Sequence, residues 1–344
     1  MADIVHESVS ATETRVADAR ARLFSSPEEE FAALRTVCGV FDPGGRARIV
    51  LTGEDRTKWL NGMVTNNVRD LAAGRGVYSF LLNPQGHILA DMTIFNRGEY
   101  ILVDTDVAQG EKVRATFDHY IIMDDVELGD ETDKTATIAV QGPRAAEVLR
   151  RDGINFTERE PIAIEDAVWN GIGISVVRSR TIGFEIWLNP TQATQIWEAL
   201  VAAGATPVGT DAVEMWRIAE GIPRYGQDIR ERELPQETAQ DHALSFTKGC
   251  YVGQEIVERI RSRGAVHRTF TGFRFAGSPA PGTKLSKDGR EVGEITSVAT
   301  LPSPGGSISV GLGYVRREAG APGTKLDAGG VEATVSALPF SLDQ

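Results

Sequence analysis

The sequence lacks the grouped cysteines and histidines from which metal centres and disulfide frameworks are built. Two cysteines, Cys38 and Cys250, occur among 344 residues. Neither has a second cysteine or a histidine at the spacing of a zinc site. Two cysteines in so long a chain make no disulfide framework, so we expect a reducing compartment, the cytoplasm. A dinucleotide fingerprint and a complete phosphate loop are also absent.

Long apolar runs and an excess of positive charge are missing as well. No stretch approaches the ~18 consecutive apolar residues of a membrane span. The N-terminal region has no apolar core of a secretory signal. The net charge of −12, from 36 basic and 48 acidic residues, disfavours nucleic acid as the main partner because phosphate neutralisation needs a cationic surface. We therefore expect neither a membrane nor a nucleic acid among the partners.

What the sequence contains is a mixture of strand and helix patterns. Runs rich in β-branched residues predict strands at 46–53, 76–82, 87–95 and 99–106, and helical spacing predicts helices at 54–64, 107–121 and 191–204. After residue 267 only short strands and turns follow. The pentapeptide PGTKL occurs there twice, at 281–285 and 322–326, and we interpret the two copies as equivalent turns.

These changes of pattern predict an α+β protein with a C-terminal all-β barrel or sandwich. We expect five segments. They are an N-terminal extension at 1–39, α+β domains at 40–133 and 134–215, a segment carrying the cysteine motif at 216–267, and a β-barrel at 268–344.

The octapeptide KGCYVGQE, residues 248–255, is too polar for a core segment and carries the second cysteine. Lys248 lies two residues from Cys250 and would favour the thiolate, which is the reactive form, as would a helix that begins directly after the cysteine. Gly249 and Gly253 remove side-chain bulk, so a ligand or partner can approach the backbone. The alternative is that Cys250 is a small buried hydrophobe, which is our interpretation of Cys38 among its apolar neighbours.

The residues alone leave the chemistry of Cys250 open. It could act as a transient ligand, a nucleophile or a redox thiol. It cannot hold an iron–sulfur cluster unaided, because such clusters take about four thiolates. A protease-type dyad would require His242 or His267 as the base.

Through this octapeptide and several other segments, the sequence resembles the YgfZ-type folate-binding proteins, relatives of the aminomethyltransferase (T-protein) of glycine cleavage. KGCYVGQE is the specific part of the resemblance. LTGEDRTKWLNGMVTNNV (51–68), LLNPQGHILAD (81–91), AVQGP (139–143), RTIGFEI (180–186) and WRIAEGIPRYGQDI (216–229) follow the family patterns in order.

The resemblance implies three domains in a ring around a channel that binds tetrahydrofolate or a one-carbon derivative of it. It also implies a role in making or repairing the iron–sulfur clusters of client proteins, with Cys250 essential. We expect Lys248 to assist Cys250 by favouring its thiolate. The position at which T-protein grips the pterin is Glu185, and a carboxylate can accept two parallel hydrogen bonds from pterin N–H groups. Arg217 is the candidate for a folate carboxylate.

Within the octapeptide, Gly249, Tyr251, Gly253 and Gln254 complete the expected cofactor contacts. The arginines at 259, 261 and 263 are candidates for a polyglutamate tail, with a solvated face as the alternative.

One position departs from the T-protein pattern. Where T-protein carries an aspartate that assists chemistry at the folate, this sequence has Asn67. An amide does not exchange a proton near neutral pH, so general acid–base catalysis is lost there. We therefore expect folate binding by Glu185 and Asn67 in an accessory protein. The alternatives are a folate-dependent aminomethyl or other one-carbon transferase and a purely structural docking module.

Overall fold

The computed structural model describes residues 22–342 apart from 158–159, 182 and 265. The chain forms two compact units, each assembled from segments that are discontinuous in sequence. Unit 1 comprises Met1–Trp59, Val68–Tyr78 and Met92–Val213, and unit 2 comprises Leu60–Asn67, Ser79–Asp91 and Glu214–Gln344.

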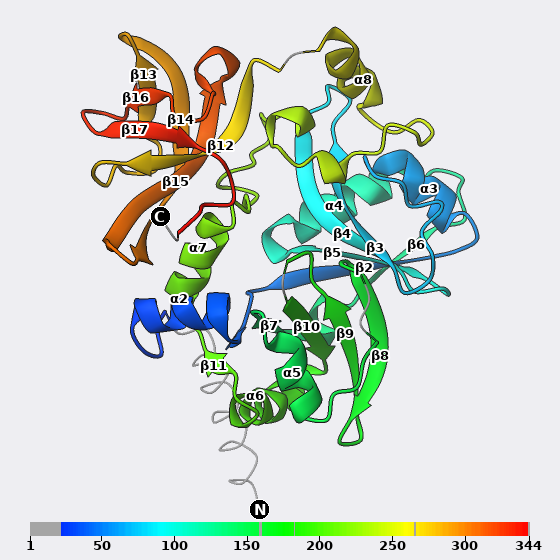
Figure 1. Ribbon diagram of the computed structural model, residues 1–344. Coiled ribbons are helices and arrows are strands. Elements are labelled where there is room, and N and C mark those ends of the chain that lie inside the picture. The colour runs from blue at the N-terminus through cyan, green and yellow to red at the C-terminus, as the bar shows by residue number, and fades with distance from the viewer. Residues whose placement is uncertain (1–21, 158–159, 182, 265, 343–344) are drawn as a thin grey trace, which may run out of the picture. The chain divides into compact units, whose positions relative to one another are not determined.

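A six-stranded sheet in the order β11-β1-β7-β10-β9-β8 organises unit 1. Its strands are β1 (Gly39–Phe41), β7 (Ala136–Gln141), β8 (Ala163–Trp169), β9 (Ile172–Arg178), β10 (Gly183–Leu188) and β11 (Thr206–Pro207). Helices α5 (Ala145–Arg151) and α6 (Ala193–Ala202) cover one face of this sheet (Figure 1). Side chains alternate between the faces of a strand, so Ile186 packs into the core under these helices while Glu185 and Trp187 point to the other face.

A second sheet, of five strands in the order β3-β4-β5-β2-β6, lies against that other face. Its strands are β2 (Arg46–Thr52), β3 (Gly76–Leu82), β4 (Ile88–Asn96), β5 (Ile101–Asp106) and β6 (Glu127–Asp130). Phe95 and Leu102 of this sheet pack on Trp187, with the rings of Phe95 and Trp187 edge to face at 5.5 Å. Helix α4 (Val107–Tyr120) packs on β2 and β5.

The expected N-terminal extension is folded where the structure describes it. Helix α2 (Pro27–Thr36) follows the N-cap Ser26, and residues 1–21 lie outside the described part. The carboxylate of Glu30 is fully buried and accepts hydrogen bonds from the backbone N–H groups of Phe24 and Gly209, at 2.5 and 2.7 Å. These bonds satisfy a charge that would otherwise be costly to bury.

Unit 2 contains a closed barrel of six strands. They are β12 (Arg268–Phe275), β13 (Lys284–Lys287), β14 (Arg290–Ser303), β15 (Gly306–Arg316), β16 (Lys325–Asp327) and β17 (Glu332–Ser336). Both PGTKL copies are turns whose glycine has a positive φ, 86° at Gly282 and 84° at Gly323, and each leads into a short strand. The predicted α+β class and the C-terminal barrel are confirmed, and of the two all-β alternatives the barrel is the one found.

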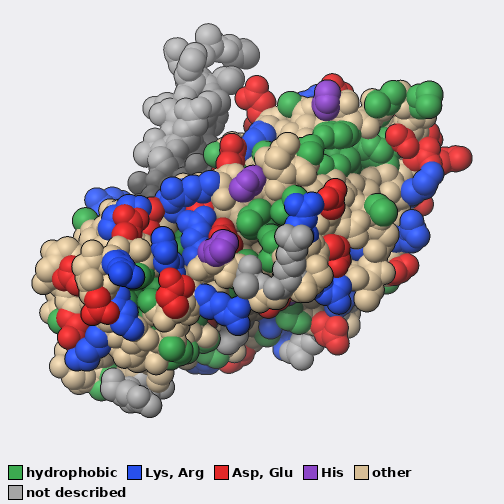
Figure 2. Space-filling view, turned by 90° about the horizontal axis from the view of Figure 1, so that it is seen from above, with side chains coloured by type: hydrophobic (Ala, Val, Ile, Leu, Met, Phe, Trp, Pro, Cys, Tyr) green, Lys and Arg blue, Asp and Glu red, His purple; other side chains and the backbone are tan. Residues whose placement is uncertain are grey.

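The remaining elements are short. They are α3 (Arg56–Met63), α7 (Thr210–Ala219), α8 (Gln254–Arg263), and the 3-10 turns η1 (Thr132–Lys134), η2 (Pro190–Gln192), η3 (Pro235–Glu237), η4 (Asp241–Ala243) and η5 (Arg317–Ala319). Within the described ranges, no helix has the length and apolarity that a membrane crossing requires. Basic and acidic side chains are interspersed over the face shown in Figure 2.

Candidate functional site

The loop that carries Cys250 is fastened to the Thr65–Asn67 turn within unit 2. Thr65 Oγ1 donates a hydrogen bond to Ala243 O at 2.7 Å, and Asn66 Nδ2 donates to His242 O at 2.8 Å. Two segments about 180 residues apart in sequence are thus tied by side chain to backbone contacts. The turn that carries Asn67 and the cysteine loop therefore form one local assembly.

Lys248 makes more of these contacts than Thr65 or Asn66 does. Its Nζ donates to the carbonyl oxygens of Asn61, Val64 and Asn66 at 2.6, 2.6 and 2.7 Å. An ammonium group has three N–H bonds, so these carbonyls use its donor capacity. A cation at these carbonyls also complements the C-terminal end of α3. The contacts therefore give Lys248 the role of a loop anchor, whereas the sequence suggested a group that favours the Cys250 thiolate.

Cys250 is a free, solvent-exposed cysteine. The preceding Gly249 is also exposed, and among the described residues no heavy atom beyond Gly249 and its two chain neighbours lies within 4 Å of the position that a Cβ at Gly249 would take. The thiol thus stands in an open part of a loop that is anchored on both sides. Cys38 is the opposite case: it is fully buried, and burial raises the pKa of its thiol to about 12.

The helix expected directly after Cys250 begins later than predicted. Helix α8 starts at Gln254, and its N-cap is Gly253 in the left-handed conformation with φ 81°. A Cβ at Gly253 would lie 2.7 Å from Asn83 O. Across the same contact, a Cβ at Gly86 would lie 2.8 Å from Ile256 Cβ. The two glycines let the Asn83–Gly86 turn and the start of α8 pack backbone to backbone.

This packing predicts that Gly253→Ala destabilises unit 2 by about 2–4 kcal/mol, because a left-handed backbone is unfavourable for alanine and the methyl group would overlap a carbonyl oxygen. The matched control is Gly249→Ala, where the space is open and no positive φ is required. We expect the control to change stability by less than about 0.5 kcal/mol. Urea unfolding of both variants measures this difference, and equal stabilities would contradict the assignment.

Tyr251 turns inward from the same loop. It is 7% exposed, and its hydroxyl has no hydrogen-bond partner within the described part of the chain. Lys248 Nζ lies 5.1 Å from the centre of its ring, and burial, reinforced by the charge of Glu258, raises the pKa of the phenol to about 12. The contacts therefore make Tyr251 part of the packing under the loop, where its ring has no exposed face for the expected cofactor contact. Gln254 is partly buried in the first turn of α8.

Glu185 lies in unit 1, on the face of β10 that meets the five-stranded sheet. It is partly buried, and Trp187 Nε1 donates to its Oε2 at 2.8 Å. The guanidinium of Arg48 stacks 4.0 Å from the centre of the Trp187 ring. Arg46 Nε donates to Asp104 at 3.1 Å, and Arg48 Nε lies 3.5 Å from the same carboxylate. A polar cluster of Glu185, Trp187, Arg46, Arg48 and Asp104 is therefore enclosed between two sheets.

The ionised form of Glu185 is disfavoured in this cluster. Burial raises the pKa of the carboxyl above its ordinary value, and the nearby Asp104 carboxylate raises it further. Arg46, the hydrogen bond from Trp187 and Arg48 act in the opposite direction without cancelling the rise. Additional N–H donors would therefore stabilise the ionised carboxylate of Glu185.

Comparison with known proteins identifies the family. Residues 8–248 match the model of the GCVT N-terminal domain. The chain belongs to the GCVT family. Residues 269–340 match the CAF17 C-terminal β-barrel domain.

Relatives named as aminomethyltransferases match most of the chain. An aminomethyltransferase of Geobacillus kaustophilus (strain HTA426) is 32% identical over 336 residues, which is 92% of this chain and 91% of the relative. An aminomethyltransferase of Rubrobacter xylanophilus (strain DSM 9941) is 31% identical over 306 residues, 86% of this chain and 80% of the relative. The crystal structure of the glycine cleavage system aminomethyltransferase T from Bartonella henselae covers 95% of this chain and 96% of its own, with a TM-score of 0.84 at 22% identity. The chain therefore has the aminomethyltransferase-like fold.

Asn67, an expected folate contact, lies in the same turn of unit 2. Asn67 is partly buried, and its backbone N–H donates to Asn66 Oδ1 at 2.9 Å. Lys248 and His242 hold Asn66 in turn. The turn is therefore fixed by the cysteine loop, and the position of Asn67 depends on the anchor Lys248.

Arg217 requires a correction. It is 6% exposed, and its five N–H groups donate to Glu214 (twice), Asp228, Ser297 and the carbonyl of Ile222. Asp228 is itself completely buried. A guanidinium has five donors, so none remains for a folate carboxylate. Arg217 closes a buried ion pair, and the expected ligand role does not fit its contacts.

The arginines after the cysteine motif have local partners. Arg259 donates to Glu255 at 2.6 Å, one helical turn away. Arg261 lies 3.5 Å from Glu258 and over the ring of Phe246. The side chain of residue 263 lies outside the described part. The polyglutamate contact stays a prediction, and the observed pairs are those of a solvated helix face.

Sequence reasoning missed most of the cluster around Glu185. Trp187 could have been found, because it lies two residues from Glu185 and shares its face of the strand. Arg46 and Arg48 alternate with Ala47 at the start of a strand that continues with the apolar residues 49–51, which is a signal for enclosed charged side chains. Asp104 gave no signal within its own strand. Throughout the described residues, no group of three or more His, Cys, Asp or Glu side chains is arranged to hold a metal ion.

Proposed function

We propose that this chain is a tetrahydrofolate-binding accessory protein of the YgfZ type, which serves the assembly or repair of iron–sulfur clusters in client proteins through the thiol of Cys250. The observation that carries the proposal is the exposure of this thiol on a loop that Lys248 anchors with three hydrogen bonds. A structural cysteine is normally buried and inert, as Cys38 is. An exposed thiol on a rigid loop is suited to meet a partner.

Glu185 supports the folate part of the proposal. Folate would supply a pterin whose N–H groups can donate to a carboxylate, and the one-carbon unit of the bound cofactor would supply any transfer chemistry. The residues of this chain fit such a ligand, since Glu185 is an acceptor whose charge is incompletely compensated. Trp187 and Arg48 orient the carboxylate. Arg217 is not part of the proposed site.

A transferase is the second candidate, favoured by the name aminomethyltransferase that the bacterial relatives carry. Against it stands Asn67, at the position where the resemblance expects a carboxylate. An asparagine can donate and accept hydrogen bonds but cannot hold a proton in transit at neutral pH. We therefore expect binding of the folate without efficient aminomethyl transfer.

A pair of assays separates the two candidates. Calorimetric titration with tetrahydrofolate should show saturable binding, whereas incubation with an aminomethyl-lipoyl donor and tetrahydrofolate should give little transfer. Asn67→Asp should raise any transfer rate by about 10²–10⁴-fold if only the acid–base group is missing. Efficient transfer by the unaltered chain would favour the transferase, and absence of saturable folate binding would contradict both candidates in favour of a docking module.

The proposed place of action is the cytoplasm. An exposed free cysteine is readily oxidised or cross-linked in an oxidising compartment, and Cys250 is such a cysteine. The partners in the proposal are a folate and iron–sulfur client proteins.

A further inference from the structure

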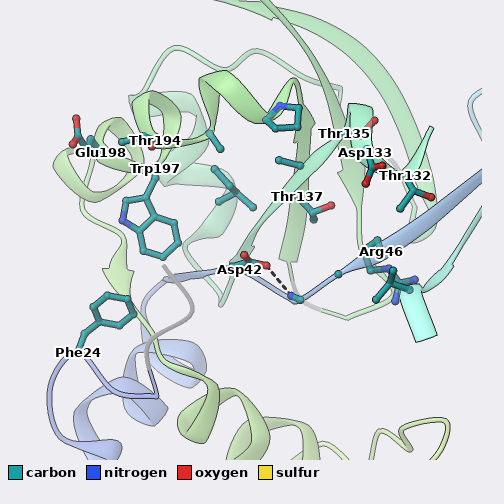
Figure 3. A pocket seen from close by; sticks show the side chains of 17 residues that line it. Phe24, Asp42, Arg46, Thr132, Asp133, Thr135, Thr137, Thr194, Trp197 and Glu198 are labelled. Atoms are coloured by element: carbon teal, nitrogen blue, oxygen red, sulfur yellow. Dashed lines mark hydrogen bonds between the residues drawn. The ribbon is translucent and has the colours of Figure 1, made fainter. Parts of the chain in front are cut away.

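A cavity of about 580 Å³ lies entirely within unit 1, at the open edge of β7. Strand β1 pairs with β7 only as far as Phe41, which lies opposite Ala139. Residues 136–138 of β7 pair with β10 along their other edge, and on the side of β1 they line the cavity. The chain that leaves β1 and the helix α6 complete the wall (Figure 3). The six-stranded sheet therefore has a gap beside residues 136–138, where β1 would lie if it continued.

The local sequence explains why β1 ends there. The residues after Phe41 are Asp42, Pro43, Gly44 and Gly45. Pro43 has no N–H to donate to β7. Asp42 Oδ1 accepts a hydrogen bond from the N–H of Gly44 at 2.8 Å, and Gly44 has a φ of 97°, which a glycine adopts without strain. This turn carries the chain away from β7 and leaves the gap open (Figure 3).

The backbone of Thr137 faces this gap. Val40 O accepts a hydrogen bond from Val208 N at 2.9 Å, so the N–H and C=O groups of Val40 face away from β7. These groups point to alternate sides in successive residues of a strand, so those of Phe41 face β7 and those of its partner Ala139 face β1. By the same alternation, the N–H and C=O of Thr137, two residues before Ala139, point into the gap. Among the described residues, no backbone group pairs with them there.

One end of the cavity is aromatic. The rings of Phe24 and Trp197 lie 6.1 Å apart at an interplanar angle of 36°, and Figure 3 shows them together at one side of the space. Phe24 is 42% exposed, yet its backbone is fixed because its N–H donates to the buried carboxylate of Glu30. Trp197 lies on α6, which covers the face of β7 to which Ala136 and Ile138 point. The gap therefore has a preformed aromatic surface on its α6 side.

We propose that this gap binds an extended segment of another protein, which adds to β7 as a short strand in the place of a longer β1. One residue of the segment would donate its N–H to Thr137 O and accept from Thr137 N–H, the pair of bonds that antiparallel strands exchange. Its side chain would lie on the face of Thr137, away from α6. The next residue would point to α6, where an aromatic side chain meets Phe24 and Trp197. A small residue followed by an aromatic one therefore fits the gap.

Strand addition accounts for both features of the gap. Main-chain hydrogen bonds supply affinity and a pocket for alternate side chains supplies specificity, and a cavity of about 580 Å³ suits a ligand of the size of a short peptide. Glu185 does not line this cavity. The inference therefore goes beyond the proposed function and does not depend on it.

The test uses an uncharged probe, N-acetyl-alanyl-phenylalanine methylamide, on the full-length protein. Calorimetry should give saturable binding with a Kd of about 1 mM or tighter. An analogue with N-methylalanine in place of alanine lacks the N–H that would donate to Thr137 O, and it should bind about 10-fold more weakly. An analogue with alanine in place of phenylalanine lacks the ring and should also bind about 10-fold more weakly. Tetrahydrofolate should neither displace the peptide nor be displaced by it.

Amide hydrogen exchange, measured by NMR, locates the peptide at one residue. In the free protein the N–H of Thr137 should exchange faster than that of Ala139, because Ala139 is paired with Phe41. Saturating peptide should slow the exchange of Thr137 at least about 10-fold and leave that of Ala139 within about twofold.

A pair of variants tests the aromatic surface. Trp197→Ala should weaken the peptide about 10-fold, through loss of the ring face. The matched control is Trp216→Ala, which removes another partly buried tryptophan, on α7 in unit 2, that does not line the cavity. The control should leave the affinity within about twofold. Thermal unfolding identifies a variant that fails to fold, and the peptide analogues keep the test decisive in that case because they need no variant.

The inference is overturned if the peptide shows no saturable binding below about 10 mM, or if the N-methylalanine analogue binds as tightly as the parent. Slow exchange of Thr137 in the free protein would also overturn it, because another part of the chain would then already fill the gap. Displacement of the peptide by tetrahydrofolate would overturn it too, since the gap would then belong to the folate site.

Discussion

Replacing Cys250 with serine is expected to abolish the contribution of this protein to iron–sulfur enzymes in cells while leaving tetrahydrofolate affinity within about twofold. Serine keeps the size of the side chain but does not form the soft, polarisable thiolate that binds iron or attacks sulfur. Cys250 is exposed, so the exchange removes no core packing. The measurement is the activity of a cluster-dependent enzyme in cells that depend on this chain, complemented with the variant.

The second cysteine supplies the control. Cys38 is fully buried, so Cys38→Ala should cost about 1 kcal/mol of stability through lost packing and leave cluster-enzyme activity intact. In the folded protein, iodoacetamide should label Cys250 and spare Cys38, and urea should make both reactive. Retained enzyme activity with Cys250→Ser, or labelling of Cys38 ahead of Cys250, would count decisively against the proposed role of the thiol.

Local patterns predicted the local features of the fold. The two PGTKL pentapeptides are turns because Pro followed by Gly satisfies a positive φ at the third position of the turn, as Gly282 and Gly323 show. The C-terminal strands were predicted because turn residues interrupt short β-branched runs at regular spacing. The strand expected at 99–106 and the helix expected at 107–121 correspond to β5 and α4. In each case the decisive contacts are made by neighbours in sequence.

The environment of the site could not be predicted in the same way. Lys248 was interpreted through Cys250, two residues away, whereas its three hydrogen bonds go to residues more than 180 positions away. Arg217 was interpreted as a ligand residue because the sequence does not show that the fold brings Asp228 and Ser297 to its guanidinium. The hydrogen-bond acceptors of long side chains such as Lys and Arg are determined by tertiary packing, and they cannot be read from a single sequence.

The two glycines of the octapeptide also show which roles could be predicted from the sequence and which could not. The octapeptide contains Gly249 and Gly253, and both were interpreted as giving access to the cysteine. Only Gly249 stands in open space. Gly253 has a left-handed backbone and a carbonyl oxygen 2.7 Å from where its Cβ would lie, so it serves packing. A glycine in a sequence shows that no side chain is present at that position. The reason depends on which atoms lie close to it in the folded structure.

Exchanging Glu185 for glutamine is expected to weaken tetrahydrofolate binding about 30- to 150-fold, which corresponds to about 2–3 kcal/mol for loss of hydrogen bonds to a charged acceptor. The amide retains the shape and one acceptor oxygen, but its NH₂ group would oppose the N–H donors of a pterin. Calorimetric titration of both proteins measures the change. Trp187→Phe is a milder companion, since it removes the hydrogen bond to Glu185 Oε2 and keeps an aromatic ring.

The pH dependence gives this prediction a signature that a purely structural role would not share. The pKa of Glu185 is raised by burial and by Asp104. Pterin donors bind the ionised carboxylate, so affinity should be complete above this raised pKa and fall as the pH drops through it. The Glu185→Gln variant should lack that component of the pH profile. Identical profiles for the two proteins would contradict the assignment of Glu185 as the pterin acceptor.

As the pH changes, the contribution of Glu185 to folding stability should change in the opposite direction to tetrahydrofolate affinity. A carboxyl whose pKa is higher in the folded than in the unfolded protein binds its proton more tightly when folded. Its contribution therefore favours folding as the pH falls and opposes folding above the raised pKa, where the group is ionised. Glu185→Gln removes this opposition, so at neutral pH its melting temperature should equal or exceed that of the unaltered protein. A variant that lost folate affinity but kept or gained stability would mark Glu185 as a ligand residue. A variant that lost both would instead make Glu185 a structural member of the cluster with Arg46 and Arg48.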